Sequence, residues 1–182
     1  VTGFVAQKRS IVFASRFVQY KNLDRVLTVM GQIHLEGHGI QLVLMGDGRE
    51  LQHLRDRVQT EGLSCVVEVR GPVPEAEVLA ETQGCLLTLA PAYTEFNPNY
   101  LLRGIAYGKP FLISKEHGLP FAVPDMLTFD PMDEQELIHK LHYLLSEEGY
   151  LRAKQWLATL EYKQTWNDVI KKNVEIIQKL CA

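Results

Sequence analysis

The sequence contains no continuous apolar run of the roughly 18 residues that a membrane-spanning helix needs. It has only three cysteines, Cys65, Cys85 and Cys181, at spacings that suit neither a zinc site nor a disulfide framework. It also lacks an initiator methionine and a signal-peptide pattern, as expected of a segment cut from a longer protein. We therefore expect reduced thiols, no metal site and a cytoplasmic location, with a parent protein that could lie peripheral to a membrane.

The chain also has no strong excess of positive or of negative charge. The chain of 182 residues carries a net charge of −3, and its lysines and arginines are scattered. A nucleic-acid binder needs a clustered basic face, so we expect no nucleic-acid partner. Apolar residues make up 46% of the chain and charged residues 23%, which is typical of a globular protein of one domain.

Histidine offers little evidence for a metal site. His139 and His142 lie three positions apart in a predicted helix, a spacing that could suit a metal ion. No acidic residue or cysteine of fitting spacing accompanies them in the sequence. We interpret them as part of a solvated helix face.

Short apolar runs alternate with helical patterns along most of the chain. The predicted strands cover residues 11–14, 41–45, 66–69, 85–89, 111–114 and 127–129. The predicted helices cover 22–36, 49–61, 75–82, a segment after Pro98, then 133–146, 150–160 and 164–180. Continuous apolar strands that alternate with helices indicate a parallel sheet covered on both faces. We therefore predict an α/β fold, a Rossmann-like doubly wound parallel sheet with C-terminal helices.

Two loops that follow predicted strands carry suggestive residues, because ligands of such sheets bind at the carboxyl ends of the strands. Arg16 and Lys21 follow the first strand, and two fixed cations can neutralise a diphosphate. Gly46 and Gly48 follow the second strand and permit a tight turn or a close approach to a ligand. From the residues alone, a basic loop beside a helix start and an ordinary turn explain the same patterns.

The segment from Pro91 to Pro110 reads as a strand end, a tight loop and a short helix stopped by Gly108. Free amide N–H groups near Asn97, Asn99 and Tyr100, at the start of this helix, would point toward a bound anion. Pro98 fits the first helical turn, where its missing N–H costs nothing.

This segment resembles the donor-site motif of the group 1 retaining glycosyltransferases, Pro-Ser-x-x-Glu-x7-Glu-Ala-x-Ala-x-Gly-x-Pro. Glu95 matches the first glutamate of the motif, whereas Arg103 stands in the place of the second. Arg16 and Lys21 match a Gly-Arg-x4-Lys pattern with Ser15 in the place of the glycine. Gly46 and Gly48 match a Gly-x-Gly turn, and the resemblance extends from Val12 to about Trp166.

The resemblance implies one half of a GT-B fold, namely the donor-binding domain of a glycosyltransferase that transfers a sugar from a nucleotide-sugar with retention. Residues 1–182 would form this single domain, with the N-terminal domain that holds a sugar or lipid-linked acceptor absent from the chain. The donor would be a UDP- or GDP-sugar, and no further cofactor or metal is implied.

The resemblance also implies roles for individual residues. Arg16 and Lys21 would stabilise the leaving diphosphate, and Glu95 would orient the sugar. The residues expected to bind the nucleotide are Gly46, Gly48, Arg70, Asn97, Asn99, Tyr100, Arg103 and Gly118. Arg70 could stack on the base. Arg103 has no acceptor for the ribose hydroxyls, so it would pair with Glu95 or meet a phosphate.

Two substitutions keep other interpretations open. Arg103 replaces one acid of the family pattern, and Phe121 replaces the glutamate that usually follows Gly-Leu-Pro. Both favour a degenerate, non-catalytic domain that binds a sugar nucleotide or acts as a scaffold. A nucleotide-sugar epimerase of the same fold would need further acids and a histidine pair across the cleft.

Overall fold

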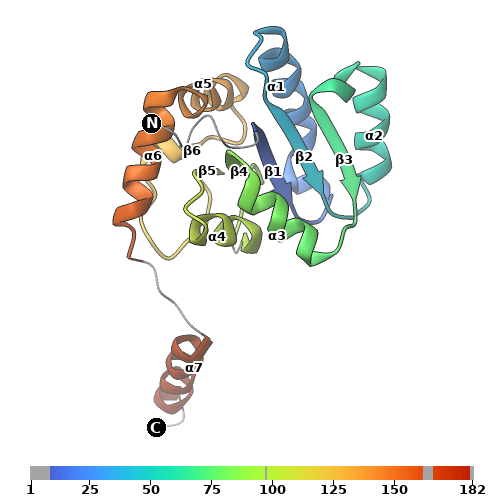
Figure 1. Ribbon diagram of the computed structural model, residues 1–182. Coiled ribbons are helices and arrows are strands. Elements are labelled where there is room, and N and C mark those ends of the chain that lie inside the picture. Colours follow the sequence, from blue (N-terminus) through green and yellow to red (C-terminus); the bar gives the residue numbers. More distant parts are fainter. Residues whose placement is uncertain (1–8, 97, 162–165, 181–182) are drawn as a thin grey trace.

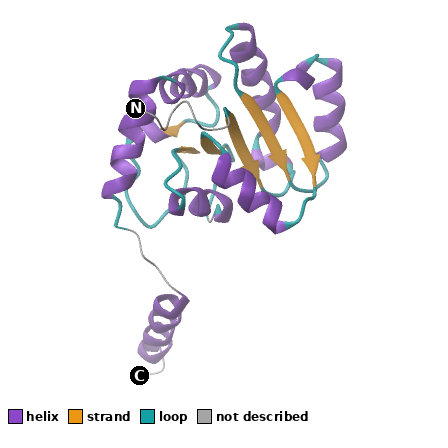
Figure 2. Cartoon of the chain, in the orientation of Figure 1, coloured by secondary structure: helices purple, strands orange, loops and turns teal. Residues whose placement is uncertain are grey.

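The computed structural model describes residues 9–96, 98–161 and 166–180. Its centre is a sheet of six parallel strands in the order β3-β2-β1-β4-β5-β6 (Figures 1 and 2). The strands are β1 Ser10–Ala14, β2 Gln41–Met45, β3 Val67–Gly71, β4 Leu87–Ala90, β5 Phe111–Ser114 and β6 Thr128–Phe129. The helices are α1 Leu23–Leu35, α2 Leu51–Thr60, α3 Glu75–Gly84, α4 Asn99–Ala106, α5 Glu134–Leu145, α6 Glu147–Thr159 and α7 Trp166–Leu180.

Side chains on the two faces of the central strands enter different clusters, as the alternation of a β-strand requires. Ile11 and Phe13 of β1 face the large core, into which α1, α2 and α5 also pack. Val12 lies on the opposite face with Val43 of β2, where Val78 of α3 packs against them. The sheet is therefore covered on both faces, which confirms the predicted doubly wound fold.

Several boundaries differ from the predicted ones. Strand β3 continues to Gly71 instead of ending at residue 69, and β4 begins two residues after Cys85. Helix α6 starts at Glu147, before the predicted residue 150, because the side chain of Ser146 accepts a hydrogen bond from the Gly149 amide and caps it.

The topology brings two distant loops together. Strand order reverses between β1 and β4, which are neighbours in the sheet although α1, β2, α2, β3 and α3 separate them in sequence. The loops that follow β1 and β4 therefore leave the same edge of the sheet side by side. Such a switch point is where ligands bind in open parallel sheets.

The Gly46–Gly48 turn packs directly onto the loop that follows β1. Gly46 has φ 145° and Gly48 has φ 154°, a region that other residues rarely adopt. A Cβ on Gly46 would lie 1.9 Å from the carbonyl oxygen of Ser15, and one on Gly48 would lie 2.2 Å from that of Phe17. These two glycines let the loops after β1 and β2 come into contact, which fixes the backbone beside Arg16.

The two cysteines in the described ranges are free thiols. Cys65 is an exposed free thiol and Cys85 a buried one, and burial raises the pKa of Cys85 to about 12. Cys181 lies outside the described residues.

Helix α7 lies apart from the layered body in Figure 1, and Ile170, Val174, Ile176 and Ile177 on it are exposed. The side chain of Trp166, near which the family resemblance ends, is not described. None of the helices in the described ranges combines the length and the apolar character that crossing a membrane requires.

Replacing Gly46 with alanine should lower the free energy of unfolding by about 2 kcal/mol or more, because the new Cβ overlaps the Ser15 carbonyl. The matched control is Gly84→Ala, since Gly84 ends a helix and a Cβ there meets nothing within 4 Å. The control should be neutral or stabilising by up to about 1 kcal/mol. Chemical denaturation measures both, and a Gly46→Ala variant as stable as the control would contradict the loop contact.

Candidate functional site

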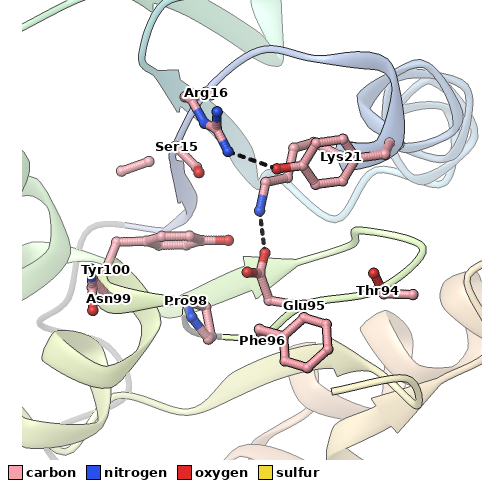
Figure 3. Close-up of a pocket in the computed structure, with 11 residues that line it drawn as sticks. Ser15, Arg16, Lys21, Thr94, Glu95, Phe96, Pro98, Asn99 and Tyr100 are labelled. Atoms are coloured by element: carbon pink, nitrogen blue, oxygen red, sulfur yellow. Dashed lines mark hydrogen bonds and ion pairs between the residues drawn. The ribbon is translucent and has the colours of Figure 1, made fainter. Parts of the chain in front are cut away.

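A cavity of about 670 Å³ opens between the loops that follow β1 and β4; we call it the Lys21 groove. It is lined by Ala14, Ser15, Arg16, Tyr20, Lys21, Thr94, Glu95, Phe96, Pro98, Asn99 and Tyr100. Arg16, Lys21 and Glu95, which the sequence singles out, all lie in this one groove. Figure 3 shows them on opposite walls, with the cations above and the carboxylate below.

Lys21 and Glu95 form a buried ion pair across the groove (Figure 3). Lys21 ends a short 3-10 turn, Gln19–Lys21, whereas Glu95 belongs to the loop after β4. The two residues are only 5% and 7% exposed. A buried charge is costly without a partner, so each of these side chains offsets the cost of burying the other.

Arg16 lies on the same wall as Lys21 but is exposed to solvent. Its Nη2 donates a hydrogen bond to the Tyr20 hydroxyl at 3.0 Å, and the Lys21 Nζ lies 5.1 Å from the centre of the Tyr20 ring. The tyrosine thus holds two cations near one another. Arg16 can direct its remaining donors to an anion in the groove.

Two main-chain hydrogen bonds fix the loop that carries Glu95. The Glu95 amide donates to the carbonyl of Glu116 at 2.9 Å, and the Gly118 amide donates to the carbonyl of Glu95 at 2.8 Å. A Cβ on Gly118 would lie 3.0 Å from the carbonyl oxygen of Phe96. Gly118 therefore shapes the Glu95 loop in this structure, and it also lines a small adjoining cavity with His117. Burial lowers the pKa of His117, which favours its neutral form.

Helix α4 begins at the floor of the groove with Asn99. Pro98 takes the N-cap position, one residue before the position that the sequence suggested. The first-turn amides of a helix have no intrahelical acceptor, so they can bind an anion. Asn97, also expected here, lies outside the described residues.

Tyr100 anchors this helix to the sheet. Its hydroxyl donates to the carbonyl of Leu89 at 2.5 Å, and its ring meets Phe13 edge-on with centroids 5.4 Å apart. Burial, followed by the nearby Glu95 carboxylate, raises the pKa of Tyr100 well above its usual value. The phenol is therefore neutral and engaged with the protein, so its side chain fixes the start of α4.

A second cavity of about 430 Å³, the Arg103 groove, continues from the first. Its lining residues are Ala14, Ser15, Met45, Gly46, Pro72, Val73, Glu75, Val78, Asn99, Tyr100 and Arg103. Four of these, Ala14, Ser15, Asn99 and Tyr100, also line the Lys21 groove. The charged Lys21 groove and the largely apolar Arg103 groove thus form one continuous surface at this edge of the sheet.

Arg103 does not pair with Glu95, which was one of the two partners expected for it, and its contact with a phosphate stays a prediction. The Arg103 Nη2 lies 2.5 Å from the Glu75 Oε1 at the start of α3, whereas Glu95 is paired with Lys21. The reason is geometric, since Arg103 is the fifth residue of α4 and lies on the side that packs beside α3. Glu75 was not singled out in the sequence, although its place just after β3 was a usable signal.

Arg70 is not placed to stack on a base. Its guanidinium pairs with Glu68 at 2.9 Å, with Glu81 at 2.8 Å and with Glu77 at 3.4 Å. The hydrogen bond to Glu68, helped by Glu81, raises the pKa of Arg70 further above its usual value. Arg70 is not among the residues that line either groove, because these acids hold it against α3.

Two more residues of the sequence pattern serve the packing. Gly48 contacts Phe17, as described above, and is absent from the lining of both grooves. Phe121, where the family pattern has a glutamate, packs near Trp156 with ring centroids 6.4 Å apart. Position 121 therefore contributes an apolar contact to α6.

His139 is exposed on α5, as expected of a solvated helix face, whereas His142 is only partly exposed and contacts neighbouring side chains. Its Nε2 lies 2.5 Å from Glu36 Oε2, and its ring lies 4.8 Å from that of His38. These three side chains come close enough to share a metal ion, as do Asp24, Glu50 and His53. Glu36 was missed because it lies at the C-cap of α1, 106 positions away in sequence. The absence of a functional metal site stays a prediction.

The sequence profile of the family described as "Glycosyl transferases group 1" matches residues 1–157. The chain belongs to this family. A curated relative, an exopolysaccharide phosphotransferase of Streptomyces coelicolor, is 27% identical over 150 residues. That match covers 80% of this chain but only 16% of the relative, so the chain spans about a sixth of the relative's length.

Solved structures of glycosyltransferases share the fold. The catalytic domain of the Helicobacter pylori cholesterol-α-glucosyltransferase has a TM-score of 0.70 and 21% identity, covering 83% of this chain and 93% of that one. The Anabaena HepE protein, solved with UDP and glucose, has a TM-score of 0.70 and 17% identity, covering 97% of this chain and 49% of that one. This family member is therefore a Rossmann-like half of a GT-B fold, as predicted.

Because Lys21 is in a buried ion pair and Arg16 is exposed, we expect removal of these two cations to have very different effects on stability. Lys21→Met should lower the free energy of unfolding at pH 7 by about 3 kcal/mol, because it leaves the Glu95 charge buried without a partner. Arg16→Ala, the matched control on the same wall, should change it by less than about 0.5 kcal/mol because Arg16 is exposed. Urea denaturation compares the two. Equal stabilities would show that the Lys21–Glu95 pair is not buried in solution.

Proposed function

We propose that this chain is the donor-binding domain of a retaining glycosyltransferase that uses a UDP- or GDP-sugar. The observation that supports this most strongly is the meeting of Arg16, Lys21 and the start of α4 in one groove at the switch point of the sheet. Such a groove suits a diphosphate, and the adjoining apolar groove suits a nucleoside. Membership of the family and the UDP bound to the HepE protein support the same donor class.

The proposed chemistry follows from where charge develops. Transfer breaks the bond between the anomeric carbon and the diphosphate oxygen, so negative charge grows on the leaving diphosphate. Arg16, Lys21 and the first-turn amides of α4 would stabilise that charge. The Glu95 carboxylate would accept hydrogen bonds from hydroxyl groups of the sugar and orient it.

The acceptor would be held by a second domain. We propose a sugar or lipid-linked acceptor held by an N-terminal domain of the parent protein. The curated relative, which extends far beyond the matched segment, supports a larger parent protein. We therefore expect that this chain alone performs no sugar transfer beyond slow hydrolysis of the donor.

A second candidate function is a non-catalytic domain that binds a sugar nucleotide or acts as a scaffold. Two observations favour it. Arg103 and Phe121 occupy positions where the family pattern has acids, and the structure engages both in contacts within the protein. In addition, the buried pairing with Glu95 leaves Lys21 a partner even when no ligand is bound. A domain of this kind would bind the nucleotide without supporting transfer in the parent protein.

Calorimetric titration of the chain with UDP, GDP and the matching nucleosides tests the proposed site. Arg16→Ala should weaken diphosphate binding about ten-fold or more, because it removes charge-assisted hydrogen bonds, and should leave nucleoside binding unchanged. The matched control is Arg152→Ala, because Arg152 is an exposed arginine on α6 that pairs with Glu148 of the same helix. This control should bind like the wild type.

Two results would contradict the proposal. Absence of binding by the wild type to any of these nucleotides would remove the donor-site assignment and leave the scaffold function. Equal loss of nucleoside and diphosphate binding in Arg16→Ala would show that Arg16 does not act on the phosphates.

A further inference from the structure

The Arg103 groove has walls of two kinds. Met45 at the end of β2, Pro72 and Val73 after β3, and Val78 on α3 supply apolar surface. A flat, weakly polar ring such as a nucleobase fits this kind of surface. The groove also has two charged residues. Glu75 is the first residue of α3, and Arg103 lies on α4.

The place where the two grooves meet indicates where the ribose of a bound nucleotide would lie. A diphosphate in the Lys21 groove and a base among the apolar residues are joined by the ribose. The ribose must therefore cross the shared residues, Ser15 and Asn99 among them, and enter the Arg103 groove. Its two adjacent hydroxyl groups are donors that need acceptors in the protein or in water.

Glu75 is suited to accept these hydrogen bonds. Among the described residues that line the Arg103 groove, it supplies the one carboxylate, and a carboxylate accepts two parallel hydrogen bonds. Its side chain is 66% exposed, so a ligand can reach it. Arginine has no acceptor, so Arg103 cannot perform this role itself.

The Arg103–Glu75 pair restricts where this carboxylate points. The Arg103 Nη2 and the Glu75 Oε1 lie 2.5 Å apart, and the side chains of Arg103 and Glu75 are 43% and 66% exposed. An exposed ion pair of this kind adds little stability to a fold. Its clearer consequence is to hold the Glu75 carboxylate at the groove. The family pattern has an acid at the position of Arg103 on α4. In this chain the acid at the groove is Glu75, on the neighbouring α3.

We propose that Glu75 is the hydrogen-bond acceptor for the vicinal ribose hydroxyls of the donor nucleotide, and that Arg103 is a positioning residue for it. The assignment rests on the proposed nucleotide-sugar site. It makes this chain selective for ribonucleotides over nucleotides that lack the 2′ and 3′ hydroxyl groups.

The test is calorimetric titration with UDP and GDP and with their 2′,3′-dideoxy forms. The wild type should bind the ribonucleotide about ten-fold or more tightly than the dideoxy form, the difference expected for hydrogen bonds to a charged acceptor. Glu75→Ala should bring this ratio close to one by weakening only the ribonucleotide. The matched control is Glu77→Ala, because Glu77 lies in the same first turn of α3 but pairs with Arg70.

Variants of Arg103 test the positioning role. Arg103→Ala should lower the ratio several-fold, whereas Arg103→Lys, which keeps a cation beside Glu75, should retain more of it. A ratio that is unchanged in Arg103→Ala would overturn the positioning role and leave the pair a surface ion pair.

The outcomes separate this assignment from the proposed function. If no nucleotide binds the wild type, the proposed function fails and the role of Glu75 fails with it. If the wild type binds ribonucleotide and dideoxy forms equally, the nucleotide site stands and the Glu75 assignment alone is overturned. A wild-type ratio that persists in Glu75→Ala, or falls equally in Glu77→Ala, also overturns it.

Discussion

The buried ion pair between Lys21 and Glu95 is the constraint on which the site depends. It joins the loop after β1 to the loop after β4 across the switch point of the sheet, between residues 74 positions apart. Neither charge can be left unpaired at this burial, so the two loops are held together when no ligand is present. The same contact places a cation and a carboxylate at opposite walls of one groove.

In the proposed function, a donor that enters the groove would change this balance. Its diphosphate offers Lys21 an anionic partner, while hydroxyl groups of the transferred sugar offer Glu95 donors. Each partner of the pair can thus exchange the other for the ligand without leaving an unsatisfied charge. Arg16, held beside Lys21 through Tyr20, adds an exposed cation whose removal we expect to change stability little. On this wall Lys21 would serve both stability and binding, whereas Arg16 would serve binding alone.

Local patterns in the sequence predicted the elements and the edge of the sheet at which Arg16, Lys21 and Glu95 meet. Buried parallel strands are apolar on both faces, and ligand loops follow their carboxyl ends, so residue order alone carries this information. The partners of Arg70, Arg103 and His142 could not be predicted in this way. Each depends on which acid a neighbouring helix presents, and that is set by packing between elements far apart in sequence.

The departures from the family pattern gain a physical meaning from these contacts. Arg103 replaces an acid, but it draws Glu75 to the same groove and keeps a carboxylate there. Phe121 replaces another acid and joins the apolar packing near Trp156. In our proposal the first change keeps an acceptor for the ribose, whereas the second removes a polar group without a visible replacement among the described residues. Loss of transfer with retention of nucleotide binding would fit this combination.

The central claim is that Lys21 exchanges Glu95 for a diphosphate in the groove at the switch point. A crystal structure of the chain soaked with UDP or GDP tests it most directly. The account predicts the diphosphate against Arg16, Lys21 and the first turn of α4, with the Lys21 ammonium turned from Glu95 toward a phosphate oxygen. A nucleotide bound elsewhere, or a diphosphate in the groove with Arg16 and Lys21 turned away from it, would contradict the account.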